Sequence, residues 1–186
     1  MTSVNWTRWS GPAAVVGGAA MLVIVVCKAA GLHAGPFQYL FPSIPLLFLL
    51  TVMGLFGLGN PWRFGRTGLF LAFLGAALTM VGLVILLWFN KEPGWGIGFY
   101  GLVALSAGLG IFGISAMRNK VLSRWNALPL LIALLFGLPW LFIPDSALGK
   151  LVPWAHNAIF ALYSGAWMAL GYVLWSDSRG LSAVRD

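Results

Sequence analysis

Long apolar stretches alternate with short polar, glycine- and proline-containing breaks along almost the whole chain. A helix needs about 20 apolar residues to cross a hydrocarbon layer of roughly 30 Å, and six windows of about that length lie between the breaks. The predicted helices cover residues 12–30, 39–58, 67–89, 96–117, 126–143 and 153–175. The pattern therefore predicts an all-α integral membrane protein, a bundle of about six transmembrane helices that forms a single polytopic domain over residues 1–186.

The fifth predicted helix is short and contains both Pro129 and Pro139. Proline lacks a backbone N–H and its ring clashes with the preceding turn, which kinks or breaks a helix interior. Neighbouring helices can satisfy the freed backbone groups in a membrane bundle. We therefore expect this helix to be kinked or broken.

Composition supports the membrane interpretation. Hydrophobic residues make up 60% of the chain and charged residues 8%, and the mean hydropathy is +0.92, which lies far from the balance of an ordinary soluble domain. The net charge of +7 is spread singly or in small groups between apolar stretches, so it predicts membrane topology and no nucleic-acid partner. Cys27 is the only cysteine, which excludes an intrachain disulfide and a cysteine-based zinc site.

The basic residues and tryptophans predict an orientation. Eight of the eleven Lys and Arg residues fall on one side of the predicted helices, and cytoplasmic loops carry such an excess. The eight are Arg8, Arg63, Arg66, Arg118, Lys120, Arg124, Arg179 and Arg185, whereas Lys28, Lys91 and Lys150 fall on the other side. Tryptophans, which favour the membrane interface, mark the same two boundaries. We expect a multi-pass protein of a bacterial inner membrane with both termini cytoplasmic.

Two internal repeats are compatible with this map. Cutting at the predicted cytoplasmic loops gives three helical hairpins, in which Gly11 and Gly18 of the first align with Gly68 and Gly75 of the second. Cutting into halves of three helices instead aligns residues 44–47 with residues 128–131. Such halves would be inverted in the membrane, as in many secondary transporters. The hairpin alignment is the favoured alternative.

Glycines recur at intervals of seven residues in the third and fourth predicted helices. An interval of seven returns to nearly the same helix face, so each helix has a smooth strip that another backbone can approach. The residues are Gly68, Gly75 and Gly82, followed by Gly94, Gly101 and Gly108. We interpret them as helix-packing residues; the alternative is a groove for a flat ligand such as a pigment, a quinone or a lipid tail.

Ionisable residues inside a membrane are functional candidates because their burial is costly, but here they lie near helix ends. His33, Glu92, Asp145 and His156 fall on the predicted outer side, where two imidazoles and two carboxylates would form a metal or proton site if they converged. They come from separate segments without metal-site spacing. The prediction is therefore no metal site, with this set as the alternative.

The sixth predicted helix carries His156, Tyr163 and Trp167 near one face. Together with His33 they are the outer-side candidates for binding a cofactor, although such a face more often packs against other helices. The cofactor itself is unknown, because the sequence contains no haem, zinc or nucleotide motif, and no catalytic residue is predicted.

These observations favour a non-enzymatic membrane subunit or scaffold that packs with partner proteins, lipid or pigment in a larger assembly. The expected partners are membrane lipids and either other membrane subunits or further copies of the chain. The alternative is a small transporter or channel with a site near the fifth helix. A membrane enzyme that uses the outer-side histidines and acids is a third possibility.

Overall fold

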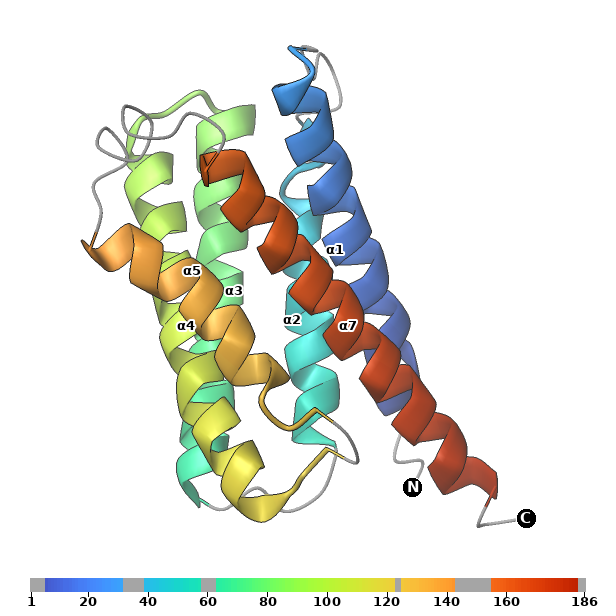
Figure 1. Cartoon of the computed structure of the whole chain (residues 1–186). Coiled ribbons are helices and arrows are strands. Elements are labelled where there is room, and N and C mark those ends of the chain that lie inside the picture. The colour runs from blue at the N-terminus through green and yellow to red at the C-terminus, as the bar shows by residue number, and fades with distance from the viewer. Residues whose placement is uncertain (1–5, 32–38, 58–62, 123–124, 143–154, 184–186) are drawn as a thin grey trace.

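The structure, a computed structural model, describes residues 6–31, 39–57, 63–122, 125–142 and 155–183. This part of the chain forms six α-helices and contains no strand. With the labels of Figure 1, they are α1 (Trp6–Ala29), α2 (Ser43–Phe56), α3 (Arg63–Trp88), α4 (Pro93–Asn119), α5 (Leu128–Phe142) and α7 (Ala155–Ala183). Four of them, α1, α3, α4 and α7, are long and apolar enough to cross a membrane, and α2 is a shorter apolar helix.

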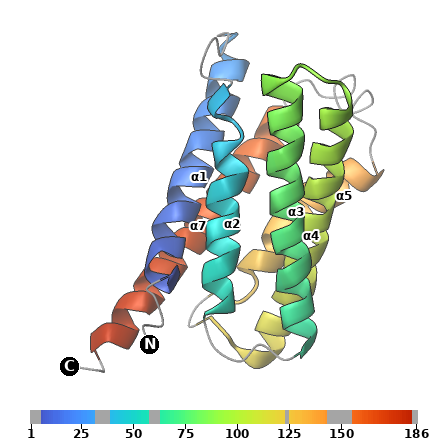
Figure 2. The ribbon, with the colours of Figure 1, turned by 180° about the vertical axis from the view of Figure 1, so that it is seen from behind.

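Each helix packs on the next along the chain, and α7 packs back on α1. Figure 2 shows α2 between α1 and α3, and Figure 1 shows α5 crossing α4 on the other side of the bundle. The two most extensive contacts are those of α3 with α4 and of α1 with α7. The bundle therefore contains two closely packed helix pairs, which α2 and α5 connect. The first residue of α1 and the last of α7 lie at the same end of the molecule (Figure 1).

Glycines bring α3 and α4 into backbone contact. A methyl group added at Gly68 would lie 2.7 Å from the carbonyl oxygen of Gly108, and one added at Gly75 would lie 2.6 Å from that of Gly101. Gly82 and Gly94 face each other in the same way at the far end of the interface, where a methyl group on Gly94 would lie 2.6 Å from the carbonyl oxygen of Gly82. All six glycines spaced by seven residues therefore lie in this one interface.

The contact of α1 with α7 uses the same register. A methyl group at Gly11 would meet the carbonyl oxygen of Gly171 at 2.8 Å, and one at Gly18 would meet that of Ser164 at 2.7 Å. In both interfaces the small residue faces a carbonyl oxygen and the backbone four residues further along the partner helix. Gly11 and Gly18 thus face α7, whereas Gly68 and Gly75, with which they align in sequence, face the next helix of the chain.

The contact between α1 and α2 is built differently. The Thr51 hydroxyl of α2 donates to the carbonyl oxygen of Leu47 at 2.9 Å and lies 3.3 Å from that of Ser10 in α1. Gly54 gives Ser10 room against α2. Gly17 of α1 also packs on α2, where an added methyl group would lie 3.0 Å from the ring of Phe48. Methyl groups at Gly17 and Gly54 would come closest to side chains of the partner helix and not to its backbone, so the first hairpin lacks the backbone contact of the second.

Several helices extend beyond their predicted ends. The α1 helix begins at Trp6 and continues through Pro12, α3 begins at Arg63, and α7 continues to Ala183. The predicted boundaries were set where the apolar stretches end. A helix can continue beyond such a point, because backbone hydrogen bonds also form between polar residues at a solvated helix end. In contrast, α2 begins later than predicted, at Ser43.

The fifth helix was expected to be kinked or broken; within the described residues it is not broken, since α5 is one continuous helix. Pro129 is its second residue, a position where the N–H would have no intrahelical partner in any case. Pro139 follows near the other end. A proline in the first turn therefore favours the start of this helix and does not interrupt it.

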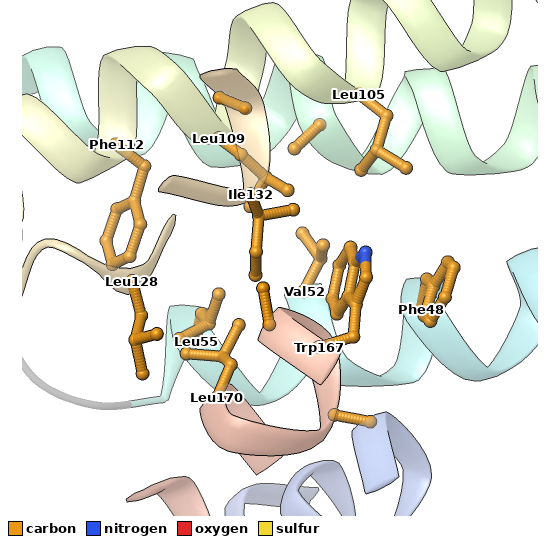
Figure 3. Packing of buried hydrophobic residues seen from close by; sticks show 14 of the residues in the cluster. Phe48, Val52, Leu55, Leu105, Leu109, Phe112, Leu128, Ile132, Trp167 and Leu170 are labelled. Atoms are coloured by element: carbon orange, nitrogen blue, oxygen red, sulfur yellow. The ribbon is translucent and has the colours of Figure 1, made fainter. Parts of the chain in front are cut away.

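The core lies between the two helix pairs, where α2 and α5 pack against α4 and α7. Figure 3 shows the indole of Trp167 beside Phe48, and the two rings are stacked at a centroid distance of 4.0 Å. Leucine, isoleucine and valine side chains from α2, α4, α5 and α7 surround this pair (Figure 3). Because Trp167 is fully buried, α7 is fixed against the middle of the bundle by its largest side chain.

Candidate functional site

A cavity of about 330 Å³ lies between the two helix pairs. One wall comes from α1 and α7, the opposite wall from α3 and α4, and the third from α2 and the residue Phe41 just before it. The described lining residues are Met21, Ile24, Val25, Lys28, Phe41, Ile44, Pro45, Phe48, Thr79, Leu83, Leu102, Leu105, Asn157, Phe160 and Tyr163. This set contains no residue of α5. A volume above 300 Å³ and mostly apolar walls are typical of small-molecule sites.

The glycine interfaces explain why the space is there. They draw α3 onto α4 and α1 onto α7 so closely that each pair forms one continuous wall. The shorter α2 separates the two walls along one side. Side chains of moderate size, such as Leu83 and Leu102, then leave the space between the walls incompletely filled.

The cavity runs from the helix ends toward the middle of the bundle. Lys28 lies in the last turn of α1 and Asn157 in the first turn of α7, so both mark its outer end. Met21 lies two turns further inside α1, which corresponds to roughly 10 Å at the α-helical rise. Tyr163 lies at a similar depth along α7.

Tyr163 is the main polar group at the inner end. Its side chain is only 1% exposed, and its ring lies among those of Phe48, Phe136 and Trp167 at centroid distances of 6.4, 5.1 and 6.2 Å. Neither the Tyr163 hydroxyl nor the Trp167 indole Nε1 has a hydrogen-bond partner among the described residues. A buried polar group left without a partner is destabilising by about 1–3 kcal/mol. Of these two donors only Tyr163 belongs to a residue of the described lining, so its hydroxyl is the group suited to a ligand oxygen.

The other polar lining groups differ from Tyr163. The Thr79 hydroxyl already donates to the Gly75 carbonyl oxygen at 2.8 Å, and at 3.4 Å it also reaches that of Gly98 in α4. Lys28 is exposed and is the only charged residue of the described lining. Its long side chain can keep the ammonium in the polar layer while its methylene groups cover apolar surface. The cavity thus combines a cation at its outer end, apolar walls and an unpartnered donor at its inner end.

The structure places the sequence-predicted site residues in different regions. Tyr163 and Trp167 lie together in the core, and Glu92 is exposed immediately before α4. His33 and Asp145 lie outside the described residues, and His156 lies in α7 but its side chain is outside the described part. Among the residues that are described, no three His, Cys, Asp or Glu side chains are close enough to hold a metal ion.

Sequence reasoning missed the lining residues outside α7. From the sequence, Lys28 was assigned only to the side with fewer basic residues and Thr79 was not among the predicted site residues, although both line the cavity. A signal was present for Asn157, which neighbours the predicted face of the last helix. For apolar residues such as Leu83 and Ile44 no signal existed, because only the packing of the pairs decides which leucines face a cavity.

No family model, no curated protein and no solved structure matches this chain. The apolar walls of the cavity and the unpartnered Tyr163 hydroxyl fit an apolar molecule with a group that accepts a hydrogen bond.

Proposed function

We propose that this chain is a non-enzymatic integral membrane protein that holds a lipid or pigment between its helices and serves as a subunit of a larger membrane assembly. The single observation that carries the proposal is the apolar cavity with the unpartnered Tyr163 hydroxyl at its inner end. In this proposal the six helices cross the membrane and both termini are cytoplasmic.

The exposed surface supports the membrane location. Large apolar side chains are exposed in the middle of several helices, for example Val23 at 61%, Phe70 at 59% and Leu162 at 60%. Exposure of many large apolar side chains along the helices is unfavourable in water but natural against lipid chains. The exposed Arg63, Arg66, Arg118 and Lys120 lie together at the other end of α3 and α4 from Lys91, which agrees with a cytoplasmic location for that end.

The cavity also suggests the class of ligand. The apolar walls favour an alkyl or prenyl body, and the Tyr163 hydroxyl favours an oxygen that accepts a hydrogen bond, such as the carbonyl of a quinone, an ester or a keto-carotenoid. A wholly apolar chain would leave the donor without a partner. The ligand should therefore enter with its carbonyl group leading and leave its tail near Lys28.

Filling the cavity tests the proposal. Leu83→Trp adds volume to a lining residue of α3, whereas Leu74→Trp makes the same change at a position of α3 that is 42% exposed. Both variants are purified in mild detergent, and mass spectrometry identifies the small molecules and proteins that co-purify. We expect an apolar, carbonyl-containing compound with the wild type and Leu74→Trp but not with Leu83→Trp. Recovery of the wild-type chain with neither a small molecule nor a partner protein would contradict the proposal.

Removing the hydroxyl tests the polar contact. Tyr163→Phe should weaken binding of the co-purified compound by about fivefold, since a hydrogen bond contributes roughly 1 kcal/mol and 1.4 kcal/mol corresponds to tenfold. Tyr172→Phe on the same helix, where the side chain is 64% exposed, is the matched control. Equal affinities of the two variants would exclude Tyr163 as the ligand's donor.

A small transporter is the second candidate function. It is supported by the position of the cavity between two closely packed helix pairs, because relative motion of two such bodies around a site is the usual basis of alternating access. In a Cys27→Ser background, a cysteine at Leu105 at the inner end of the cavity would then react with membrane-impermeant reagents from both sides of the membrane. Reaction from one side or neither favours the binding subunit.

A further inference from the structure

A second concave surface lies at the end of the bundle where α3 begins and α4 ends, far along both helices from the outer end of the cavity. It is an open groove of about 540 Å³ lined by Arg63, Phe64, Thr67, Ile114, Ser115 and Arg118. We call it the arginine groove.

Two positive charges face this groove from adjacent helices. Arg63 is the first residue of α3, Arg118 lies in the last turn of α4, and both side chains are exposed. Neither guanidinium has an ion-pair or hydrogen-bond partner among the described residues. Each guanidinium offers a planar fork of donors that matches two oxygens of a phosphate. The two arginines thus give the groove two positive charges that suit an anion.

The rest of the groove is unlike a site for a small soluble anion. Phe64 and Ile114 line it beside the arginines and are 57% and 41% exposed. The Thr67 hydroxyl is already used, since it donates to the carbonyl oxygen of Arg63 at 3.1 Å. Two cations next to exposed apolar side chains at the ends of apolar helices match a molecule with an anionic head and an acyl chain.

We propose that the arginine groove binds one anionic phospholipid, with its phosphate between Arg63 and Arg118 and an acyl chain against Phe64 and Ile114. The proposal rests on the proposed membrane location, because only then do these helix ends lie at the depth of lipid headgroups. It is independent of the ligand of the cavity, from which the groove is separated along α3 and α4.

The test compares two lipids that differ only in headgroup charge. Detergent-solubilised protein is titrated with phosphatidylglycerol and with phosphatidylcholine of the same acyl chains, and native mass spectrometry counts the bound lipid. We expect the first phosphatidylglycerol to bind about tenfold more tightly than phosphatidylcholine. The double variant Arg63→Gln/Arg118→Gln should abolish this preference and leave phosphatidylcholine binding unchanged.

A matched control separates a site from general attraction to positive charge. Arg66→Gln/Lys120→Gln removes the same charge from the same end of the bundle, but neither residue lines the groove. The lipid preference should survive in this variant and should survive in part in Arg63→Lys/Arg118→Lys. Thermal unfolding of each variant verifies that it is folded.

Three results would overturn the proposal. Equal binding of the two lipids would exclude an anionic site, and equal losses in the two glutamine double variants would show diffuse electrostatics. Displacement of the lipid by millimolar inorganic phosphate would show that a free anion is the ligand. A chain that cannot be reconstituted into bilayers at all would instead contradict the membrane location itself.

Discussion

The glycines of this chain differ sharply in the space around them. At Gly75 a methyl group would lie 2.6 Å from the carbonyl oxygen of Gly101 on the partner helix, and a backbone atom cannot move aside as a flexible side chain can. At Gly165 in α7 a methyl group would meet nothing within 4 Å. The same substitution therefore tests opposite effects at the two positions.

We expect Gly75→Ala to lower the free energy of unfolding by about 1–3 kcal/mol, the usual range for overpacking a close contact. Gly165→Ala should raise it by about 0.4–1 kcal/mol, since alanine restricts the unfolded chain and favours a helix. Unfolding in mixed micelles with increasing denaturing detergent measures both. Equal stability of the two variants would show that α3 and α4 do not touch at Gly75.

Sequence reasoning reached the residues of one interface but not those of the other. The interval of seven contains six glycines that lie between α3 and α4, but it does not contain Gly98, which faces Gly82 in the same interface. Between α1 and α7, Gly11 and Gly18 face Gly171 and Ser164. The α7 side of that interface shows no glycine interval, because Ser164 occupies the position seven residues before Gly171. Local spacing can identify a glycine strip on one helix, but it does not say which other helix packs against that strip.

At the scale of the elements, the extent of interhelical contact differs strongly from one helix pair to another. The pair of α3 and α4 has backbone contact along its length, whereas the contact of α5 with α7 is the smallest of the ring. Helices with few interhelical contacts open locally at lower free energy. Stability should therefore vary from helix to helix within the bundle.

Hydrogen exchange of the protein in lipid nanodiscs should resolve this difference. We expect amides in the middle of α3 and α4 to exchange at least tenfold more slowly than those in the middle of α5, because opening the first pair disrupts the glycine interface. Gly108→Ala should speed exchange in both α3 and α4 and leave α2 unchanged. Uniform protection of all the helices would contradict the hierarchy of contacts.

The orientation of the elements makes a separate prediction. In a Cys27→Ser background, single cysteines at Lys91, between α3 and α4, and at Asn119, the last residue of α4, report the two ends of the same hairpin. We expect position 91 to react with an impermeant maleimide added outside cells, and position 119 only after the membrane is permeabilised. Reaction in the opposite order would invert the proposed topology.

The apolar stretches and the polar, glycine and proline residues between them located the centre of each helix that the structure describes. The ends of these helices were predicted less well. Arg63 and Gly65 at the start of α3 and Trp6 at the start of α1 are helical although their surroundings are not purely apolar. Helix ends depend on capping and solvation, which leave little trace in composition. The cavity itself was not predicted. Of the candidates named for binding a cofactor, Tyr163 is in its described lining, whereas residues such as Leu83 become lining residues only when the pairs are assembled.

At the scale of the whole molecule, the apolar surface should decide where the chain is stable. Leu78 lies near the middle of α3 and is 45% exposed, whereas Phe89 follows the last residue of α3 and is 65% exposed. An arginine at the centre of a membrane helix raises the insertion free energy by about 2.5–3.5 kcal/mol, but near the interface its side chain reaches the headgroups.

Leu78→Arg should therefore strongly reduce the amount of membrane-inserted protein, and Phe89→Arg should reduce it little. Carbonate extraction followed by quantification of the membrane fraction measures both. If the two variants insert equally well, the exposed surface of α3 does not face lipid, and α3 is covered by another protein or lies in water.

The close contact of α1 with α7 also imposes an order of assembly. During synthesis α3 and α4 can join as soon as both have emerged, but α1 must wait for α7 before Gly11 and Gly18 meet their partner. Until then its glycine strip is open to lipid or to other unassembled chains. Closure by α7 therefore completes the bundle only after α7 has been made, so a chain that stops before α7 would carry an exposed strip that membrane proteases and chaperones can detect.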